Sequence, residues 1–218
     1  MLRDPMITKK IAMKSFAEFV SGTESAKARI LRGYKFPDEE GMAMAKYYWP
    51  AKSTISEFHN GKHETAWLLM KALEMESGAM TPSKPLRTKL LNNARSVKSY
   101  AEHFGGHHYE VLGNVKLPFT INGVSINVTP DMHVADGGVE IYLKFSFSKS
   151  KLKHDYVRTM LACMSYGLHA NLHDDNPEAI ALIDVPRGTV HRGLRVTDVL
   201  VGEIICQCEE LEKVWNLL

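Results

Sequence analysis

A short stretch in the middle of the chain carries two acids and a lysine at a spacing that could bring them together. Asp131 comes before a turn at 136–138, and Glu140 and Lys144 come after it. If the segments on either side of the turn are paired strands, the first carboxylate lies close to the second carboxylate and the amine. Carboxylates can hold a metal ion that activates water, and a lysine can offset charge that develops on a phosphate. The stretch therefore predicts chemistry on a phosphodiester.

Alternating side chains predict the strand that carries Glu140 and Lys144. Apolar residues occupy every second position from 139 to 147, with mostly polar residues between them. This period of two is typical of a strand that buries one face, so Glu140 and Lys144 share the other face. The segment 124–134 is rich in β-branched residues, and the Asp-Gly-Gly turn that follows suits a tight hairpin. The alternative is an edge hairpin whose polar face is simply solvated.

Breaks rich in glycine and proline divide the rest of the chain into a series of elements. We expect helices at 14–32, 61–76, 86–104 and 153–169, and a last helix that begins at Asp198 as its N-cap. We expect strands at 109–121, 124–134, 139–147 and 179–185. This order predicts an α+β fold with a helical region at 1–105 and an α/β core at 106–218, packed as one compact domain.

Composition limits the classes of protein to which the chain can belong. The chain has 218 residues, of which 44% are hydrophobic and 24% charged, and this is enough for a substantial core. A net charge of +2 is too small to indicate nucleic-acid binding by itself. Three cysteines are too few for a disulfide framework, and there is neither a long apolar run nor a signal-peptide core. We therefore expect a cytoplasmic protein with no membrane partner.

The residues around the turn resemble the PD-(D/E)XK nuclease superfamily. Pro130 and Asp131 stand where that pattern has its Pro-Asp pair, and Lys144 stands where it has its lysine. The central acid of the motif, two residues before the lysine, falls on Tyr142, so Glu140 would supply a carboxylate from one pleat further along the same face. The resemblance implies an α-β-β-β-α-β core like that of restriction endonucleases, with a mixed central sheet flanked by helices.

Two other segments are similar to the RecB-like branch of this superfamily, which includes phage exonucleases of the RecE type. The run 61–64 resembles an element that opens a helix and brings a histidine to the metal, so His63, or Glu64 beside it, is expected near the site. Tyr166 matches the tyrosine of a Gln-x-x-x-Tyr motif, whose glutamine is replaced by Ala162. The alternative for His63 is a helix cap, which is a common role for a histidine at the start of a helix. The alternative for Tyr166 is a core residue on the buried side of its helix.

Glu110, just before the first expected strand, is a further candidate ligand by the same resemblance, although a solvated residue at the start of a strand is the alternative. Histidines 103, 107 and 108 cluster beside it. The sequence does not predict a zinc site at these histidines. A structural zinc ion needs four histidine or cysteine ligands at defined spacings, and no second pair of such ligands is present.

The resemblance implies a metal-dependent DNA nuclease, exonuclease-like in action, with Asp131, Glu140 and Lys144 as catalytic residues. Mg²⁺ or Mn²⁺ would bind Asp131 and Glu140, with His63 and Glu110 as additional ligands. Expected DNA-contacting residues are Tyr142, Lys149, Lys151, Arg158 and Tyr166. DNA is the expected partner, and a second copy of the chain or a recombination protein is a possible further one.

Two alternatives stay open because Tyr142 replaces the acid of the motif. One is a catalytically inactive member of the same fold that binds DNA or serves in assembly. The other is an interaction protein that needs no metal. On the nuclease interpretation, Asp131 and Lys144 lie on an exposed polar face, so replacing them should stop cleavage and cost little stability.

Overall fold

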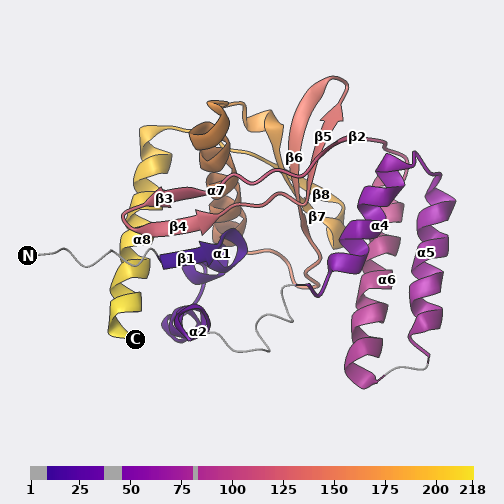
Figure 1. Cartoon of the computed structure of the whole chain (residues 1–218), viewed down its shortest axis with the longest axis horizontal. Helices are drawn as coiled ribbons and strands as arrows, with labels where there is room; N and C mark the ends of the chain where they lie inside the picture. The colour runs from indigo at the N-terminus through magenta and orange to yellow at the C-terminus, as the bar shows by residue number, and fades with distance from the viewer. Residues whose placement is uncertain (1–8, 37–45, 81–82) are drawn as a thin grey trace, which may run out of the picture.

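The computed structural model describes residues 9–36, 46–80 and 83–218, and it has the mixed α/β character expected from the sequence (Figure 1). Its helices are α1 (Met13–Val20), α2 (Glu24–Lys35), α4 (Trp49–Asn60), α5 (Thr65–Gly78), α6 (Lys84–Phe104), α7 (His154–Leu172) and α8 (Asp198–Leu217). Its strands are β1 (Lys9–Ala12), β2 (Glu110–Gly113), β3 (Phe119–Ile121), β4 (Val124–Asn127), β5 (Met132–Asp136), β6 (Val139–Ser146), β7 (Ile180–Asp184) and β8 (Thr189–Arg192).

A five-stranded mixed sheet lies at the centre of the molecule, in the order β2-β5-β6-β7-β8. β5 is antiparallel to both β2 and β6, β7 is parallel to β6, and β8 is antiparallel to β7. Gly137 and Gly138 turn the β5–β6 hairpin with φ angles of 58° and 86°, which glycine adopts without strain. The predicted hairpin is therefore confirmed. Helix α7 makes the crossover that the parallel pair β6–β7 requires.

Helices cover both faces of the central sheet (Figure 1). Ile141, Leu143 and Phe145 of β6 point into an apolar cluster with α4, α5 and α6. Tyr142 points the opposite way, into a second cluster that contains α1, α2, α7 and α8. The expectation that β6 leaves one face open to solvent is wrong at Tyr142, since a strand in the middle of a layered sheet is buried on both sides.

A second, three-stranded sheet in the order β1-β4-β3 packs in the layer that contains α7. The two strands expected at 109–121 and 124–134 are each split between this sheet and the central one. β4 ends at Asn127 and β5 begins at Met132. Pro130 lies in the gap, where it has no N–H to offer to a sheet. The chain therefore crosses from one sheet to the other just before Asp131.

The helices also differ from expectation at several ends. The helix expected at 14–32 is two helices, because α1 stops before Gly22 and Thr23 caps α2 by accepting from the Ala26 N–H. The helix expected at 61–76 is α5, which begins only at Thr65. Thr197 rather than Asp198 caps α8, by accepting from the Leu200 N–H. In the described part of the chain, no helix is both long enough and apolar enough to cross a membrane.

Candidate functional site around Asp131

Asp131 is held against the backbone of β6 at the point where the chain enters the central sheet. Its N–H donates to the carbonyl of Leu143 at 2.7 Å. Its Oδ2 accepts from the N–H of Phe145 at 2.9 Å. These two bonds lock the main chain and the carboxylate together, so the Oδ1 atom is presented in a fixed direction.

Two lysines meet at the Oδ1 atom of Asp131. Lys144 of β6 donates to it at 3.1 Å, and Lys52 of α4 donates to it at 2.8 Å. Lys144 also donates to the carbonyl of Thr129 at 2.7 Å. The structure therefore brings Asp131 and Lys144 together and adds Lys52.

These side chains do not lie on an exposed face, as the sequence led us to expect. The side chain of Asp131 is 7% exposed and that of Lys144 is 15% exposed. Helices on both sides of β6 account for this difference. Replacing either residue would therefore disturb a largely buried ion pair rather than a surface one.

Lysine side chains make the surroundings of Asp131 positively charged. Burial acts to raise the pKa of Asp131, but the charges of Lys144 and Lys52, with the Phe145 N–H, outweigh it and lower that pKa below its usual value. Burial lowers the pKa of Lys144, and the charges of Lys52 and Lys14 act in the same direction, while Asp131 opposes them. The carboxylate of Asp131 thus lies between two lysines, Lys144 and Lys52.

The residues at this place do not fit a divalent metal ion. Among the described residues, no group of three or more histidine, cysteine, aspartate and glutamate side chains is placed to hold one. Mg²⁺ and Mn²⁺ prefer several oxygen ligands. In the part of the chain that the structure describes, Asp131 is the carboxylate that contacts both lysines, and it already accepts from three N–H donors, two of which are cations that would repel a metal. The ammonium group of Lys52 neutralises Asp131 in place of a metal.

The structure does not bring Glu140 to Asp131. Glu140 pairs with Ala135, and its Oε2 lies 2.9 Å from Nε2 of His133. Glu140 is four residues from Lys144 along an extended strand, so their Cα atoms are about 13 Å apart at 3.3 Å per residue. Tyr142 lies between them on the same face, and its ring stacks on His133 with centroids 4.4 Å apart. The proposal that Glu140 supplies the missing acid is therefore wrong in this structure.

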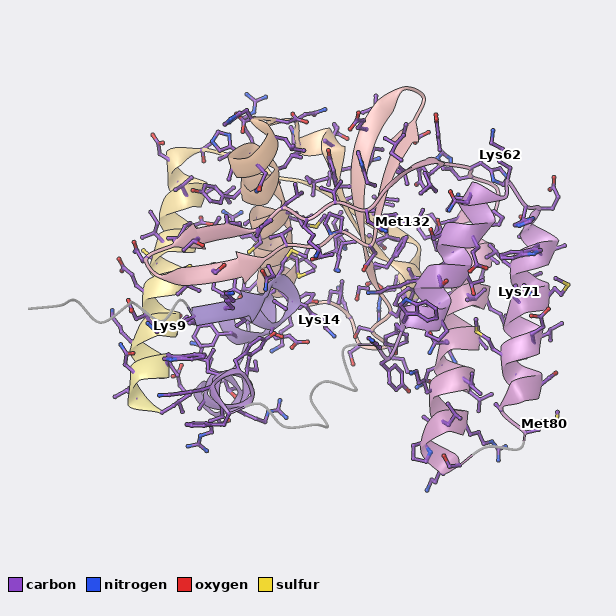
Figure 2. All side chains as sticks on the ribbon, viewed as in Figure 1. Lys9, Lys14, Lys62, Lys71, Met80 and Met132 are labelled. Atoms are coloured by element: carbon purple, nitrogen blue, oxygen red, sulfur yellow. The ribbon has the colours of Figure 1, made fainter. Side chains whose placement is uncertain are left out.

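His63 and Glu110 also lie away from Asp131. His63 is in the turn between α4 and α5, where its ring stacks on Trp67 at 4.3 Å. Figure 2 shows its neighbour Lys62 well separated from Met132. Glu110 pairs with Ala135, so it shares a row of the sheet with Glu140. Neither His63 nor Glu110 lines the hollows beside Asp131, so neither is placed to join the predicted metal site.

Three of the five expected DNA-contacting residues have structural partners instead. Tyr142 is only 4% exposed. Arg158 makes a two-pronged ion pair with Glu203 of α8, with bonds of 2.7 to 3.1 Å. Tyr166 packs edge-on against Phe119, with ring centroids 4.8 Å apart. Lys149 and Lys151 are exposed in the segment between β6 and α7.

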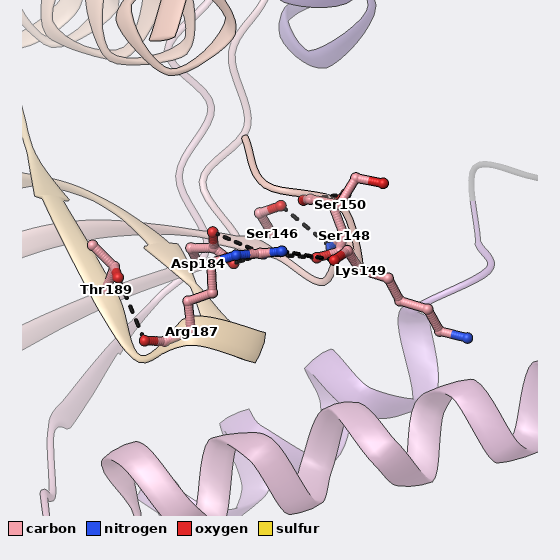
Figure 3. A network of polar contacts seen from close by, with 7 residues as sticks. All are labelled: Ser146, Ser148, Lys149, Ser150, Asp184, Arg187 and Thr189. Carbon is pink, nitrogen blue, oxygen red and sulfur yellow. Dashed lines mark hydrogen bonds and ion pairs between the residues drawn. The ribbon is translucent and has the colours of Figure 1, made fainter. Parts of the chain in front are cut away.

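An ion pair between the buried Asp184 and the partly exposed Arg187 holds the segment that carries Lys149 (Figure 3). Arg187 donates to both oxygens of the buried Asp184 at 3.2 Å. The same guanidinium donates to the carbonyls of Ser148 and Lys149, at 3.3 and 2.6 Å. The side chain of Lys149 extends away from this network (Figure 3). The backbone is therefore fixed while the ammonium group stays available to solvent.

The sequence matches no protein-family model and no curated protein. The geometry of the site therefore carries the functional argument.

A cleft runs along α4 beside Asp131. It consists of two hollows of about 390 and 230 Å³ that share Ser56, Asn114 and Asp131 in their walls. α4 supplies one wall of the larger hollow through Trp49, Lys52 and Ser53, and Lys46 lies just before the helix. The segment 111–114 supplies the opposite wall of the smaller hollow. The cleft thus combines basic groups, hydroxyls and one aromatic ring.

Sequence reasoning missed Lys46, Trp49 and Lys52, although a signal for α4 was present. Pro50 follows Trp49, and proline is common in the first turn of a helix. Apolar residues then recur at 51, 55 and 58. The helix could have been predicted from these residues. The contact of Lys52 with Asp131 could not, because 79 positions separate them.

Proposed function

We propose that the protein binds DNA in the cleft beside Asp131 and does so without a divalent metal ion. The observation that carries this proposal is the pairing of Asp131 with both Lys52 and Lys144. A carboxylate that is already neutralised by two ammonium groups has little need of a metal cation. The remaining positive charge favours an anionic ligand.

The lining of the cleft suits a phosphate backbone. Lys46 and Lys52 supply positive charge, and lysines that neutralise phosphates release counterions and so favour binding. Ser53, Ser56 and Asn114 offer hydroxyl and amide groups of the kind that position a nucleic-acid backbone.

The order of elements supports DNA as the ligand. A helix, three antiparallel strands, a crossover helix and a parallel strand follow one another from α6 to β7, apart from the β3–β4 hairpin. This is the order that the resemblance to PD-(D/E)XK nucleases implies. We take the protein to be an inactive relative of that fold, which retains the contact between aspartate and lysine but has Tyr142 in place of the metal-binding acid. We propose the cytoplasm as the compartment in which the protein meets DNA.

Lysine variants test the proposal. Binding of a fluorescently labelled DNA oligonucleotide is measured by anisotropy in EDTA at several salt concentrations. Lys46→Gln and Lys52→Gln should each weaken binding and make the salt dependence shallower, by up to about 0.9 in the slope of log K against log salt for each lost phosphate contact. Lys84→Gln, an exposed lysine at the start of α6, is the matched control. Cleft variants that bind like this control would refute the proposal.

A metal-dependent nuclease is the second candidate, favoured by the contact of Asp131 with Lys144 across the β5–β6 hairpin. Linear and circular DNA are incubated with Mg²⁺, Mn²⁺ or EDTA, with wild-type protein and with Tyr142→Glu, which restores the acid of the motif. The binding proposal expects no cleavage by the wild type under any condition. Cleavage that requires a metal and is lost in Asp131→Asn would instead establish the nuclease.

A further inference from the structure

We infer that the DNA bound in the cleft is single-stranded and that one of its bases stacks on the indole ring of Trp49. This inference rests on the proposed DNA binding and adds the class of DNA and the residue that selects it.

Trp49 is a large apolar side chain that combines exposure with a place in the wall of the cleft. It is 63% exposed although it lies in the wall of the larger hollow. A tryptophan gains a large amount of free energy when its ring leaves water, and an exposed ring in a cleft therefore offers a ready contact for a flat apolar partner. Lys46 and Lys52 lie three positions to either side of it. The ring is thus flanked by two groups that can bind phosphates.

The backbone around Trp49 is fixed from both sides. Asn93 of α6 is fully buried, and its side chain donates to the carbonyl of Tyr47 at 3.0 Å and accepts from the N–H of Ala51 at 2.9 Å. The ring of Tyr48 packs on Phe147, with centroids 5.0 Å apart. The exposed indole therefore projects from a rigid turn. A binding group that is held in place beforehand loses less entropy when its ligand arrives.

The face of a base is accessible only where the base is unpaired. In a duplex the base faces are covered by their neighbours, and proteins read the edges instead. In a single strand, aromatic side chains stack on bases of any sequence. The larger hollow, about 390 Å³, is of the size that takes one small organic molecule. A hollow of this size can admit one nucleotide of a single strand.

Charge and stacking act on the same short stretch of strand. A base on Trp49 places its neighbouring phosphates toward Lys46 and Lys52. Alternating basic and aromatic groups along a groove are the usual basis of binding to single strands without sequence preference. We therefore expect little dependence on base sequence.

The test compares a labelled single-stranded oligonucleotide with its duplex, by anisotropy in EDTA. Trp49→Ala should weaken binding of the single strand about tenfold, as expected for the loss of one stacked base, and change duplex binding little. Trp49→Phe, which keeps an aromatic face, should restore most of the affinity. Phe36→Ala is the control, because Phe36 has the same exposed fraction but does not line the cleft. Equal losses for single and double strands, or no loss at all, would overturn the inference.

The lysine variants separate the failure of this inference from the failure of the proposed function. If Lys46→Gln weakens DNA binding and Trp49→Ala does not, the cleft binds DNA and the stacking is wrong. If neither variant affects binding of any DNA, both the cleft and the stacking are wrong.

Discussion

At the scale of single residues, Asp131 shows that a suitable set of residue types does not by itself make a metal site. The acid and Lys144 meet as the hairpin register predicts, since Met132 pairs with Leu143 and the next position outward brings Asp131 beside Lys144. Lys52 changes the chemistry of the pair, because its ammonium group occupies the oxygen that a metal would need. A contact between residues so distant in sequence leaves no local pattern from which it could be predicted.

Replacement of Asp131 should be costly. Asp131→Ala leaves the largely buried Lys144 and the partly exposed Lys52 close together without their shared acid, and removing one partner of a buried ion pair costs about 3 kcal/mol or more. Urea unfolding would measure this loss as a fall in the free energy of unfolding. Asp155→Ala is the control, because Asp155 forms only an exposed pair with His154 and should lose less than about 0.5 kcal/mol. Equal losses in the two variants would show that Asp131 is not a buried partner.

At the scale of elements, strong local patterns predicted the structure well and weak ones did not. The β5–β6 hairpin, α6, α7 and β7 follow from their turn glycines and from their apolar spacing. β1 was missed because its four residues gain a partner only in β4, far along the chain. Polar residues at alternate positions of β6 predicted an open face, whereas α7 covers it. Tertiary packing decides whether the polar face of a β-strand is exposed, and the pattern of residues along one β-strand does not reveal that packing.

Helix α4, which forms a wall of the cleft, is joined to α6 and to the start of β2 by a buried histidine. His59 lies 2.7 Å from the hydroxyl of Tyr100, and its Nδ1 accepts from the N–H of Tyr109 at 3.2 Å. Nε2 therefore carries the proton of the neutral ring and donates to Tyr100. Burial, with smaller contributions from His108 and His107, lowers the pKa of His59 to about 4.

This lowered pKa predicts a loss of stability in mild acid. Between pH 6.5 and pH 4 the unfolded chain protonates His59 and the folded chain does not, so protons favour unfolding. From pH 7 to pH 4.5 the cost is about 2.5 kcal/mol in the free energy of unfolding. Urea unfolding at both pH values should show a smaller drop for His59→Gln than for the wild type. His154→Gln, which replaces an exposed histidine, should lose as much free energy of unfolding as the wild type. If His59→Gln loses as much stability as the wild type, the lowered pKa of His59 is not the source of the acid sensitivity.

At the scale of the whole molecule, the site is assembled from parts of three layers. Lys144 belongs to the central sheet and Asp131 to the segment that enters it, Lys52 and Trp49 belong to the helical layer of α4 to α6, and Lys14, which acts on Lys144, belongs to α1 on the opposite side. The hairpin that carries Asp131 and Lys144 could be predicted from the sequence because its turn is local. The cleft could not, because it exists only where α4 packs beside β2 and the segment that enters β5.

The proposed function requires that the cleft bind DNA without a metal. The most direct measurement is the affinity of the wild-type protein for a labelled single-stranded oligonucleotide, in EDTA and in Mn²⁺, over a range of salt concentrations. We predict binding in EDTA that weakens steeply as salt rises and that Mn²⁺ does not strengthen, since lysines supply the positive charge. Binding that appears only with Mn²⁺, together with cleavage of the strand, would contradict the account.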